Sequence, residues 1–166
     1  MIVGVTGDTH NNLKNIKEIC SIFNENRTDL VFHTGDISLP KSLLAFKDLK
    51  CPLKAVFGNN DIGEKEGLIE ASKSFECEIV SEPFYTEINQ KRISVFHHPD
   101  LINDEIISNN DLILHGHTHR FRLEKVESCV IFNPGECAGM MKGKNQIGLI
   151  NLESSNVEAF HILLTI

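Results

Sequence analysis

Five short apolar runs, each followed directly by polar side chains, are the feature of this sequence that most restricts its fold. The runs have the length of strands and are rich in β-branched and aromatic residues. In open α/β sheets with parallel strands, the loops that follow the carboxyl ends of the strands lie at the same end of the sheet and form the ligand site. We therefore expect the polar clusters to converge. The apolar runs are residues 2–5, 30–32, 53–57, 93–96 and 112–114.

The polar clusters supply carboxylate oxygen, amide oxygen and imidazole nitrogen. This mixture suits divalent Mn, Fe, Co, Ni or Zn. A single His or Asp after a strand is usually a turn residue, so it is the repetition that favours a metal site. The clusters are Asp8-Thr9-His10, Gly35-Asp36, Gly58-Asn59-Asn60-Asp61, His97-His98 and Gly116-His117-Thr118-His119.

Two of the clusters contain a pair of candidate ligands that are separated by one residue. These pairs are Asp8 with His10 and His117 with His119. In an extended segment, both side chains of such a pair point to the same side and can bind one ion. A glycine stands next to a candidate ligand in four of the clusters, which is consistent with a turn or with close approach of the backbone.

Length and composition indicate one globular domain, residues 1–166, whose core is large enough to fold without a structural metal. No apolar segment has the length of a membrane span. The amino terminus enters a strand at once without a preceding basic region, so we expect a cytoplasmic protein. The five cysteines form no CxxC pair, which favours reduced, buried thiols.

The formal net charge of −7 argues against binding of nucleic acid through a basic surface. It is compatible with a small phosphoester substrate, because two divalent cations would outweigh the charges of Asp8 and Asp36 in the pocket. An oligomer is compatible with the sequence, but no feature specifies one.

The order of the predicted elements indicates a mixed α/β protein. Strands and helices alternate in the first half, and residues 84–88 and 92–96 then resemble a hairpin. Predicted helices cover residues 13–25, with Asn11 or Asn12 as the N-cap, a segment after Pro40, and residues 64–74 and 101–108. Later strands are predicted at 111–115, 121–126, 129–132, 147–152 and 157–164, with a turn at 154–156.

The ordered pattern DxH, GD, GNxD, H and GHxH across residues 8–119 resembles the calcineurin-like metallophosphoesterase superfamily. The small size and the segment Asn133-Pro134-Gly135-Glu136 are most similar to its small archaeal and bacterial phosphodiesterase family. The resemblance implies an α/β fold in which a two-layer mixed β-sandwich is flanked by helices. It also implies a dinuclear metal centre at one rim of the sandwich.

Carried over by position, the resemblance assigns seven ligands. Asp8, His10 and His119 would hold the first metal. Asn59, His97 and His117 would hold the second, and Asp36 would bridge both. Mn or Ni is favoured, and Fe, Co and Zn are compatible. The implied enzyme is a metal-dependent phosphodiesterase, in which ions about 3.5–4 Å apart polarise the phosphoryl oxygens and a shared hydroxide attacks phosphorus in line. Asp36, Asn59 and Asn60 are the candidate catalytic residues.

One position departs from the family. Asn60 stands where many relatives have a histidine that protonates the leaving-group oxygen, and an amide cannot act as a general acid. Leaving groups that need no protonation are then favoured, or another group supplies the proton. His98, where relatives often have glycine, could do so, but a packing or exposed histidine is an equally good interpretation.

Other polar residues near the clusters have supporting roles at most. His33 and His115 could orient ligands, although histidines hydrogen-bonded to backbone in a core are more common. Asp61 could support the metal loop through backbone contacts. His161 belongs to no motif and receives no role.

Two other functions stay open. A phosphomonoesterase would use the same ions and hydroxide. The second alternative is not an enzyme but a metal-binding scaffold for protein interaction. It is considered because a eukaryotic retromer subunit resembles this fold. The intact set of seven candidate ligands favours metal binding over the scaffold. A nuclease is disfavoured by the acidic composition.

Overall fold

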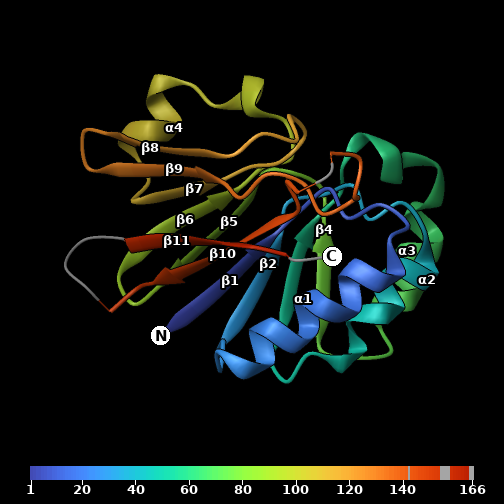
Figure 1. Cartoon of the computed structure of the whole chain (residues 1–166). Helices are drawn as coiled ribbons and strands as arrows, with labels where there is room; N and C mark the ends of the chain where they lie inside the picture. The colour runs from blue at the N-terminus through green and yellow to red at the C-terminus, as the bar shows by residue number, and fades with distance from the viewer. Residues whose placement is uncertain (142, 154–157, 165–166) are drawn as a thin grey trace.

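The structure is a computed structural model that describes residues 1–141, 143–153 and 158–164, with residues 158–161 described by their backbone alone. The expected turn at 154–156 lies outside the described residues. The described chain forms two sheets that face each other, with helices on both outer sides (Figure 1). The predicted class, an α/β two-layer mixed β-sandwich flanked by helices, is confirmed.

The first sheet has the strand order β11-β10-β1-β2-β3-β4. Strands β1 to β4 are parallel, and the β1–β10 and β10–β11 pairs are antiparallel. The carboxyl ends of β1, β2 and β3 therefore lie at one edge. The bounds are β1 (Ile2–Thr6), β2 (Leu30–His33), β3 (Leu53–Val56), β4 (Cys77–Val80), β10 (Gln146–Asn151) and β11 (Glu158–Leu163).

The second sheet has the order β5-β6-β7-β9-β8. Its central strands β6, β7 and β9 are parallel, and β5 and β8 are antiparallel edge strands. The predicted hairpin is confirmed as β5 and β6. The bounds are β5 (Phe84–Ile88), β6 (Lys91–Val95), β7 (Leu112–Leu114), β8 (Arg122–Val126) and β9 (Cys129–Asn133).

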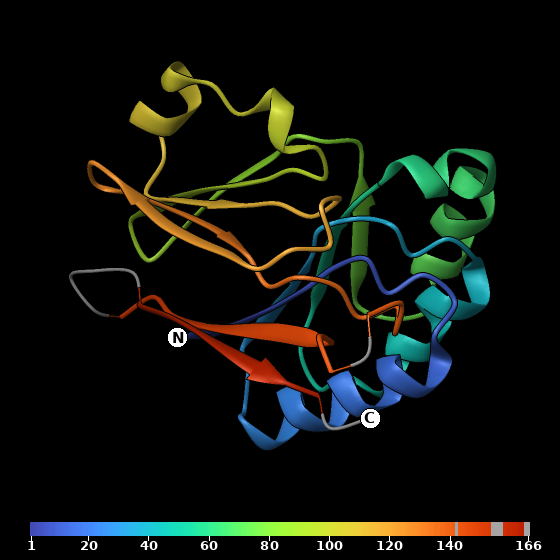
Figure 2. The same cartoon turned by 45° about the horizontal axis from the view of Figure 1, so that its top comes forward.

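The helices cover the outer faces of the two sheets (Figures 1 and 2). Ile16, Ile19 and Phe23 of α1 are buried together with residues of the first sheet, and Ile106 and Ile107 of α4 pack against the second. The Asn12 side chain caps α1, accepting from the Asn15 N–H at 3.1 Å. The bounds are α1 (Leu13–Glu25), α2 (Pro40–Leu44), η1 (Ala45–Asp48), η2 (Asn59–Glu64), α3 (Lys65–Ser72), η3 (Pro99–Leu101) and α4 (Asp104–Ser108).

The space between the sheets is filled by apolar side chains from both. Val5 and Phe32 of the first sheet and Val95, Leu114 and Phe132 of the second belong to one buried cluster. Burial of this apolar surface holds the two sheets face to face. As a result, the carboxyl ends of β1, β2 and β3 lie beside those of β6 and β7.

Two elements differ from the sequence prediction. The helix expected at 64–74 is confirmed as α3, and the unpredicted element is the 3-10 segment η2 before it, where the Asp61 carboxylate accepts from the Gly58 N–H at 2.7 Å and closes a tight first turn. Strand β4 was not predicted. Only Ile79 of its residues is buried, so the alternation was too short to recognise, and pairing with β3 stabilises the strand.

Candidate metal centre

All five polar clusters lie where the two sheets meet, directly after β1, β2, β3, β6 and β7. Backbone hydrogen bonds connect them. The Asp8 N–H donates to the Gly35 carbonyl at 3.0 Å, and the Gly116 N–H donates to the His97 carbonyl at 3.1 Å. The Asp8 carboxylate accepts from the His117 N–H at 3.1 Å, which joins the loops of the two sheets. The expected convergence of the clusters is confirmed.

Asp8, His10, Asp36 and His119, called here the first donor group, present ligand atoms within 4.8 Å of one another. His119 Nε2 lies 3.4 Å from an Asp8 oxygen, and this contact raises the pKa of His119. His10 Nε2 is buried and has no hydrogen-bond partner among the described residues. An unpartnered buried nitrogen that faces carboxylates is a suitable ligand for a cation.

Asn59, His97 and His117 form the second donor group. His97 Nε2 lies 2.9 Å from Asn59 Oδ1, and His117 Nδ1 lies 3.0 Å from the same oxygen. His97 Nδ1 lies 2.8 Å from the Thr34 carbonyl and must donate its proton there, so Nε2 of the neutral ring carries a lone pair. His97 Nε2 and Asn59 Oδ1 are then two acceptors 2.9 Å apart, and two acceptors this close need a cation or a proton near them. These residues therefore also fit a divalent cation.

Asp36 lies between the two donor groups. One of its oxygens is 3.7 Å from His10 Nε2 and the other is 3.5 Å from His97 Nε2. Burial opposes ionisation of Asp36, but hydrogen bonds from Asn60 and the nearby His97 outweigh this, so the pKa of the carboxyl is lowered. The Asn60 backbone and side-chain N–H groups donate to the two oxygens at 2.9 and 2.7 Å. An ionised carboxylate in this position can contact two cations.

The local backbone differs from the extended geometry that the spacing suggested. Asp8, His10, Asp36, His117 and His119 all have a left-handed conformation, with φ between 45° and 68°. This region is unfavourable for residues other than glycine, and such strain is concentrated at functional sites. Asp8 and His10 do converge, but through turns.

The spacing also suggested that His117 and His119 bind the same ion. This prediction is wrong, because the two histidines lie in different donor groups. His119 lies in the first donor group and His117 lies with His97 in the second, because the left-handed turns direct the two rings apart. The division agrees with the assignment that the family resemblance implied.

Asp61 supports the site through the backbone, as the sequence suggested. Its buried carboxylate accepts from the Asp36, Gly58 and Ser38 N–H groups at 2.9, 2.7 and 2.6 Å. Gly58 packs so closely against Asp36 that an added Cβ would lie 2.2 Å from Oδ1. Both features hold the Asp36 side chain between the donor groups.

His33 and His115 do not contact the candidate ligands through their side chains. His33 Nδ1 accepts from the Gly35 N–H at 3.1 Å, and its Nε2 therefore donates to Thr9 Oγ1 at 2.9 Å. Burial lowers the pKa of His33 to about 3. His33 thus ties the first two loops together as a neutral ring, and His115 Nδ1 lies 3.1 Å from the Gly116 carbonyl.

The sequence did not reveal Glu82, which holds the histidine pair. Its Oε2 accepts from the His97 and His98 N–H groups at 2.6 and 2.9 Å, and its Oε1 lies 2.5 Å from His98 Nδ1. Glu82 lies between β4 and β5 and belongs to no motif, so only the fold brings it to the site. His98 also offers a ring nitrogen within 4.8 Å of ligand atoms of His97 and His117.

The fold and the site together have the features expected of a metallophosphoesterase: two mixed sheets between helices, with candidate Asp, Asn and His donors at one rim. Among the helices that the structure describes, none is long and apolar enough to span a membrane.

The chain belongs to the calcineurin-like phosphoesterase superfamily, whose domain model matches residues 1–155. Phosphodiesterase MJ0936 of Methanocaldococcus jannaschii is 33% identical over 157 residues, which cover 92% of this chain and 94% of the relative. Membership of this family confirms the predicted enzyme class, a metal-dependent phosphoesterase, and implies that divalent metals are its cofactors.

Solved structures show the same fold. The structure of an archaeal phosphodiesterase has a TM-score of 0.90 and 32% identity, covering 99% of this chain and all of the other. Vps29 of Chaetomium thermophilum has a TM-score of 0.71 at 14% identity, covering 99% of this chain and 97% of its own, and supports the fold alone.

Proposed function

We propose that the protein is a metal-dependent phosphodiesterase with two divalent cations. The observation that carries the proposal is the position of Asp36, whose two oxygens lie 3.7 and 3.5 Å from nitrogens of the first and second donor groups. Asp8, His10 and His119 would hold one cation and Asn59, His97 and His117 the other. Asp36 would contact both. The relatives described as phosphodiesterases support the diester as substrate.

Two bound cations would polarise the phosphoryl oxygens and would supply hydroxide for attack on phosphorus near neutral pH. The chain itself holds the groups that this chemistry needs. Asn60 positions the Asp36 carboxylate through two hydrogen bonds, and Asp61 fixes the backbone around it. Because an amide releases no proton, Asn60 favours leaving groups that depart as stable anions.

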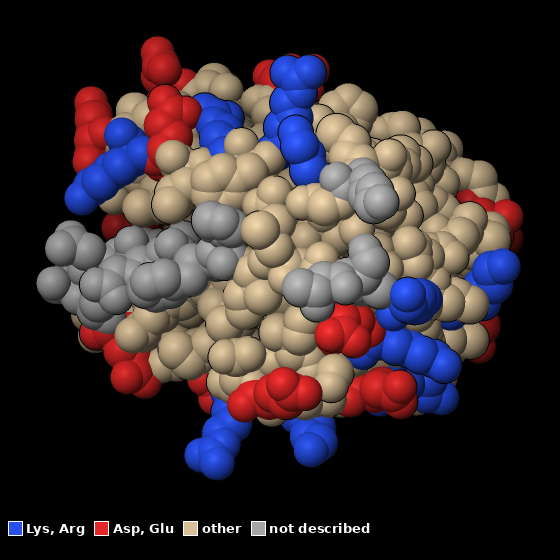
Figure 3. Space-filling view, viewed as in Figure 1, with Lys and Arg blue, Asp and Glu red and all other residues tan. Residues whose placement is uncertain are grey.

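Mn or Ni is the proposed metal, and a small phosphoester is the proposed substrate of a single-domain, cytoplasmic enzyme. On the face shown in Figure 3, basic side chains stand among acidic ones, which supports a small substrate rather than a nucleic acid.

The choice between diester and monoester is tested with two substrates of one chromogenic phenol. The Mn-loaded or Ni-loaded protein is assayed with the bis-ester and with the monoester at equal concentration. We expect a higher kcat/KM for the bis-ester. Faster hydrolysis of the monoester would establish the phosphomonoesterase alternative. A metal-loaded protein that is inert toward a broad panel of phosphoesters would favour the scaffold alternative.

Replacement of Asp36 tests the proposed bridge. Asp36→Asn removes one anionic oxygen between the cations, so kcat should fall by more than about a hundredfold, beyond the usual loss for a residue that only supports a ligand. The matched control is Asp104→Asn, which neutralises an exposed carboxylate on α4 and should leave kcat unchanged. Circular dichroism verifies that both variants are folded. Wild-type turnover of folded Asp36→Asn would exclude the bridge.

A further inference from the structure

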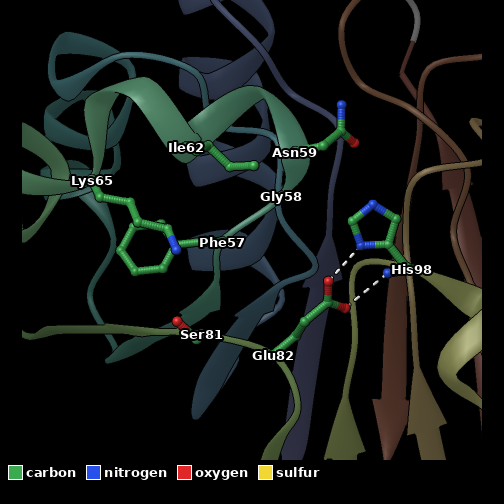
Figure 4. Close-up of a pocket in the computed structure, with 8 residues that line it drawn as sticks. All are labelled: Phe57, Gly58, Asn59, Ile62, Lys65, Ser81, Glu82 and His98. Atoms are coloured by element: carbon green, nitrogen blue, oxygen red, sulfur yellow. Dashed lines mark hydrogen bonds and ion pairs between the residues drawn. The ribbon is translucent and has the colours of Figure 1, made fainter.

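A pocket opens beside the second donor group and shares Asn59 with it. Its volume is about 130 Å³. Figure 4 shows Phe57 and Ile62 on one side of it and Glu82 with His98 on the other. A group bound at Asn59 would therefore have this pocket as its immediate neighbour.

One wall of the pocket is apolar. Ile62, in η2, is 66% exposed although it is a large hydrophobic residue, and it stands next to the largely buried Phe57. Lys65 also lines the pocket, and its ammonium group lies over the Phe57 ring, 5.2 Å from the ring centre. Phe57 belongs to the buried core, so the apolar surface that this wall offers to a ligand comes mainly from Ile62.

The opposite wall is a fixed ring. The His98 Nδ1 contact with Glu82 at 2.5 Å and the packing of its ring against His117, with centroids 4.6 Å apart, hold the His98 plane in place. Glu82 is itself fixed by the two backbone N–H groups that donate to it. The pocket is therefore preorganised, which reduces the entropy that a bound group would lose.

We propose that this pocket binds one aromatic substituent of the phosphoester while the phosphoryl group lies at the two donor groups. The inference rests on the proposed function and specifies its substrate class. An apolar cavity of about 150 Å³ is sufficient to bind benzene, and the pocket is only slightly smaller. Ile62 and His98 would contact the two faces of the ring.

The chemistry of Asn60 agrees with this substrate class. An aryloxide is a much weaker base than an alkoxide, since phenolic hydroxyls have pKa values of about 10. It can leave without a proton donor. An aromatic ester therefore suits both features: its ring fits the pocket, and its leaving group needs no proton from Asn60.

The test uses binding rather than hydrolysis. Phenylphosphonate and methylphosphonate share the anionic group and differ in the ring, and their affinities for the Mn-loaded protein are measured by calorimetry. We expect phenylphosphonate to bind about tenfold more tightly, because the pocket removes the ring from water. Ile62→Ser should reduce this preference at least threefold. Ile69→Ser, a control at an exposed isoleucine of α3 outside the pocket, should not change it.

Equal affinity for the two phosphonates, or an equal effect of the two serine variants, would refute the inference. So would a failure of phenylphosphonate to bind the Mn-loaded protein when methylphosphonate does bind it. These outcomes are separate from the proposed function. Hydrolysis of the bis-ester without a ring preference would refute only the pocket, whereas a ring preference without hydrolysis of any ester would refute the enzymatic proposal and leave the pocket established.

Discussion

Hydrogen bonds made away from the site decide which ring nitrogen His97 presents to it. The contact of Nδ1 with the Thr34 carbonyl leaves Nε2 as the atom with a lone pair. Such outer contacts fix the tautomer and orientation of a metal-binding histidine. His33 has the opposite tautomer, because its Nδ1 accepts from the Gly35 N–H, and its Nε2 donates to Thr9 in the interior. Two histidines near one rim therefore have different roles.

The neutral state of His33 should make the fold sensitive to acid. Its pKa is about 3 in the folded chain and 6.5 in the unfolded chain. The unfolded state thus binds a proton more readily, and stability that is present above pH 6.5 is lost as the pH falls toward 3. Between pH 7 and pH 5 we expect a loss of about 2 kcal/mol from this residue.

Urea unfolding of metal-free wild type and His33→Gln at the two pH values measures this loss. The variant lacks the titrating ring, so its stability should fall by about 2 kcal/mol less than that of the wild type. Parallel losses in both proteins would show that His33 does not contribute to the acid sensitivity.

At the scale of elements, the site depends on loops that contact one another because the strands before them end side by side. The segment that begins at Gly58 and continues into η2 carries Asn59, Asn60 and Asp61. Each residue of this segment contacts a different part of the rim: Asn59 contacts the histidines, Asn60 the Asp36 carboxylate, and Asp61 the backbone. A small displacement of the segment would disturb all three contacts.

Gly58→Ala tests this dependence. The new Cβ would lie 2.2 Å from Asp36 Oδ1 and 2.4 Å from the Asp36 nitrogen, so the loop or Asp36 must move. We expect the dissociation constant for Mn to rise about tenfold or more, as for other changes around a ligand. Calorimetric titration of the metal-free protein measures this.

The same segment offers a matched control, Gly63→Ala. A Cβ at Gly63 meets no described atom within 4 Å, so Mn affinity should be unchanged. Stability should be equal or slightly higher, since alanine reduces the freedom of the unfolded chain. Equal Mn affinities for the two alanine variants would contradict the close-packing argument.

For the whole molecule, the site exists only because two sheets pack face to face. Asp8, Asp36 and Asn59 follow strands of the first sheet, whereas His97 and His117 follow strands of the second. The apolar layer between the sheets, with Phe32 and Phe132 fully buried in it, therefore sets the distance between the donors.

Phe132→Ala should destabilise the protein by about 3–5 kcal/mol, because it leaves a cavity in this layer. That is a large part of the roughly 5–15 kcal/mol that stabilises a typical domain. Leu123→Ala, at a half-exposed side chain of the neighbouring strand β8, should cost less than about 1 kcal/mol. Denaturant unfolding monitored by circular dichroism compares the two, and similar losses would show that the layer between the sheets is not the main core.

Most of the fold could be predicted from the sequence, because the strands and helices have clear periodicity. Helix α1 has the predicted bounds and one of the two predicted caps. β4 and η2 could not be predicted, since β4 depends on pairing with β3 and η2 on a hydrogen bond that the Gly58 N–H donates to the Asp61 carboxylate. The ligand roles of the seven candidate residues stay predictions until metal binding is measured.

The sequence by itself determined which residues are candidate donors and which strands carry them, because residue type and strand periodicity are local properties of the chain. Spacing along the chain did not give the division of the donors, which the family resemblance implied and only the tertiary structure explains. Left-handed turns separate His117 from His119, Asp36 lies between the two groups, and Glu82 joins the site from a segment without a motif. These features depend on contacts between residues far apart in the chain, which no local pattern encodes.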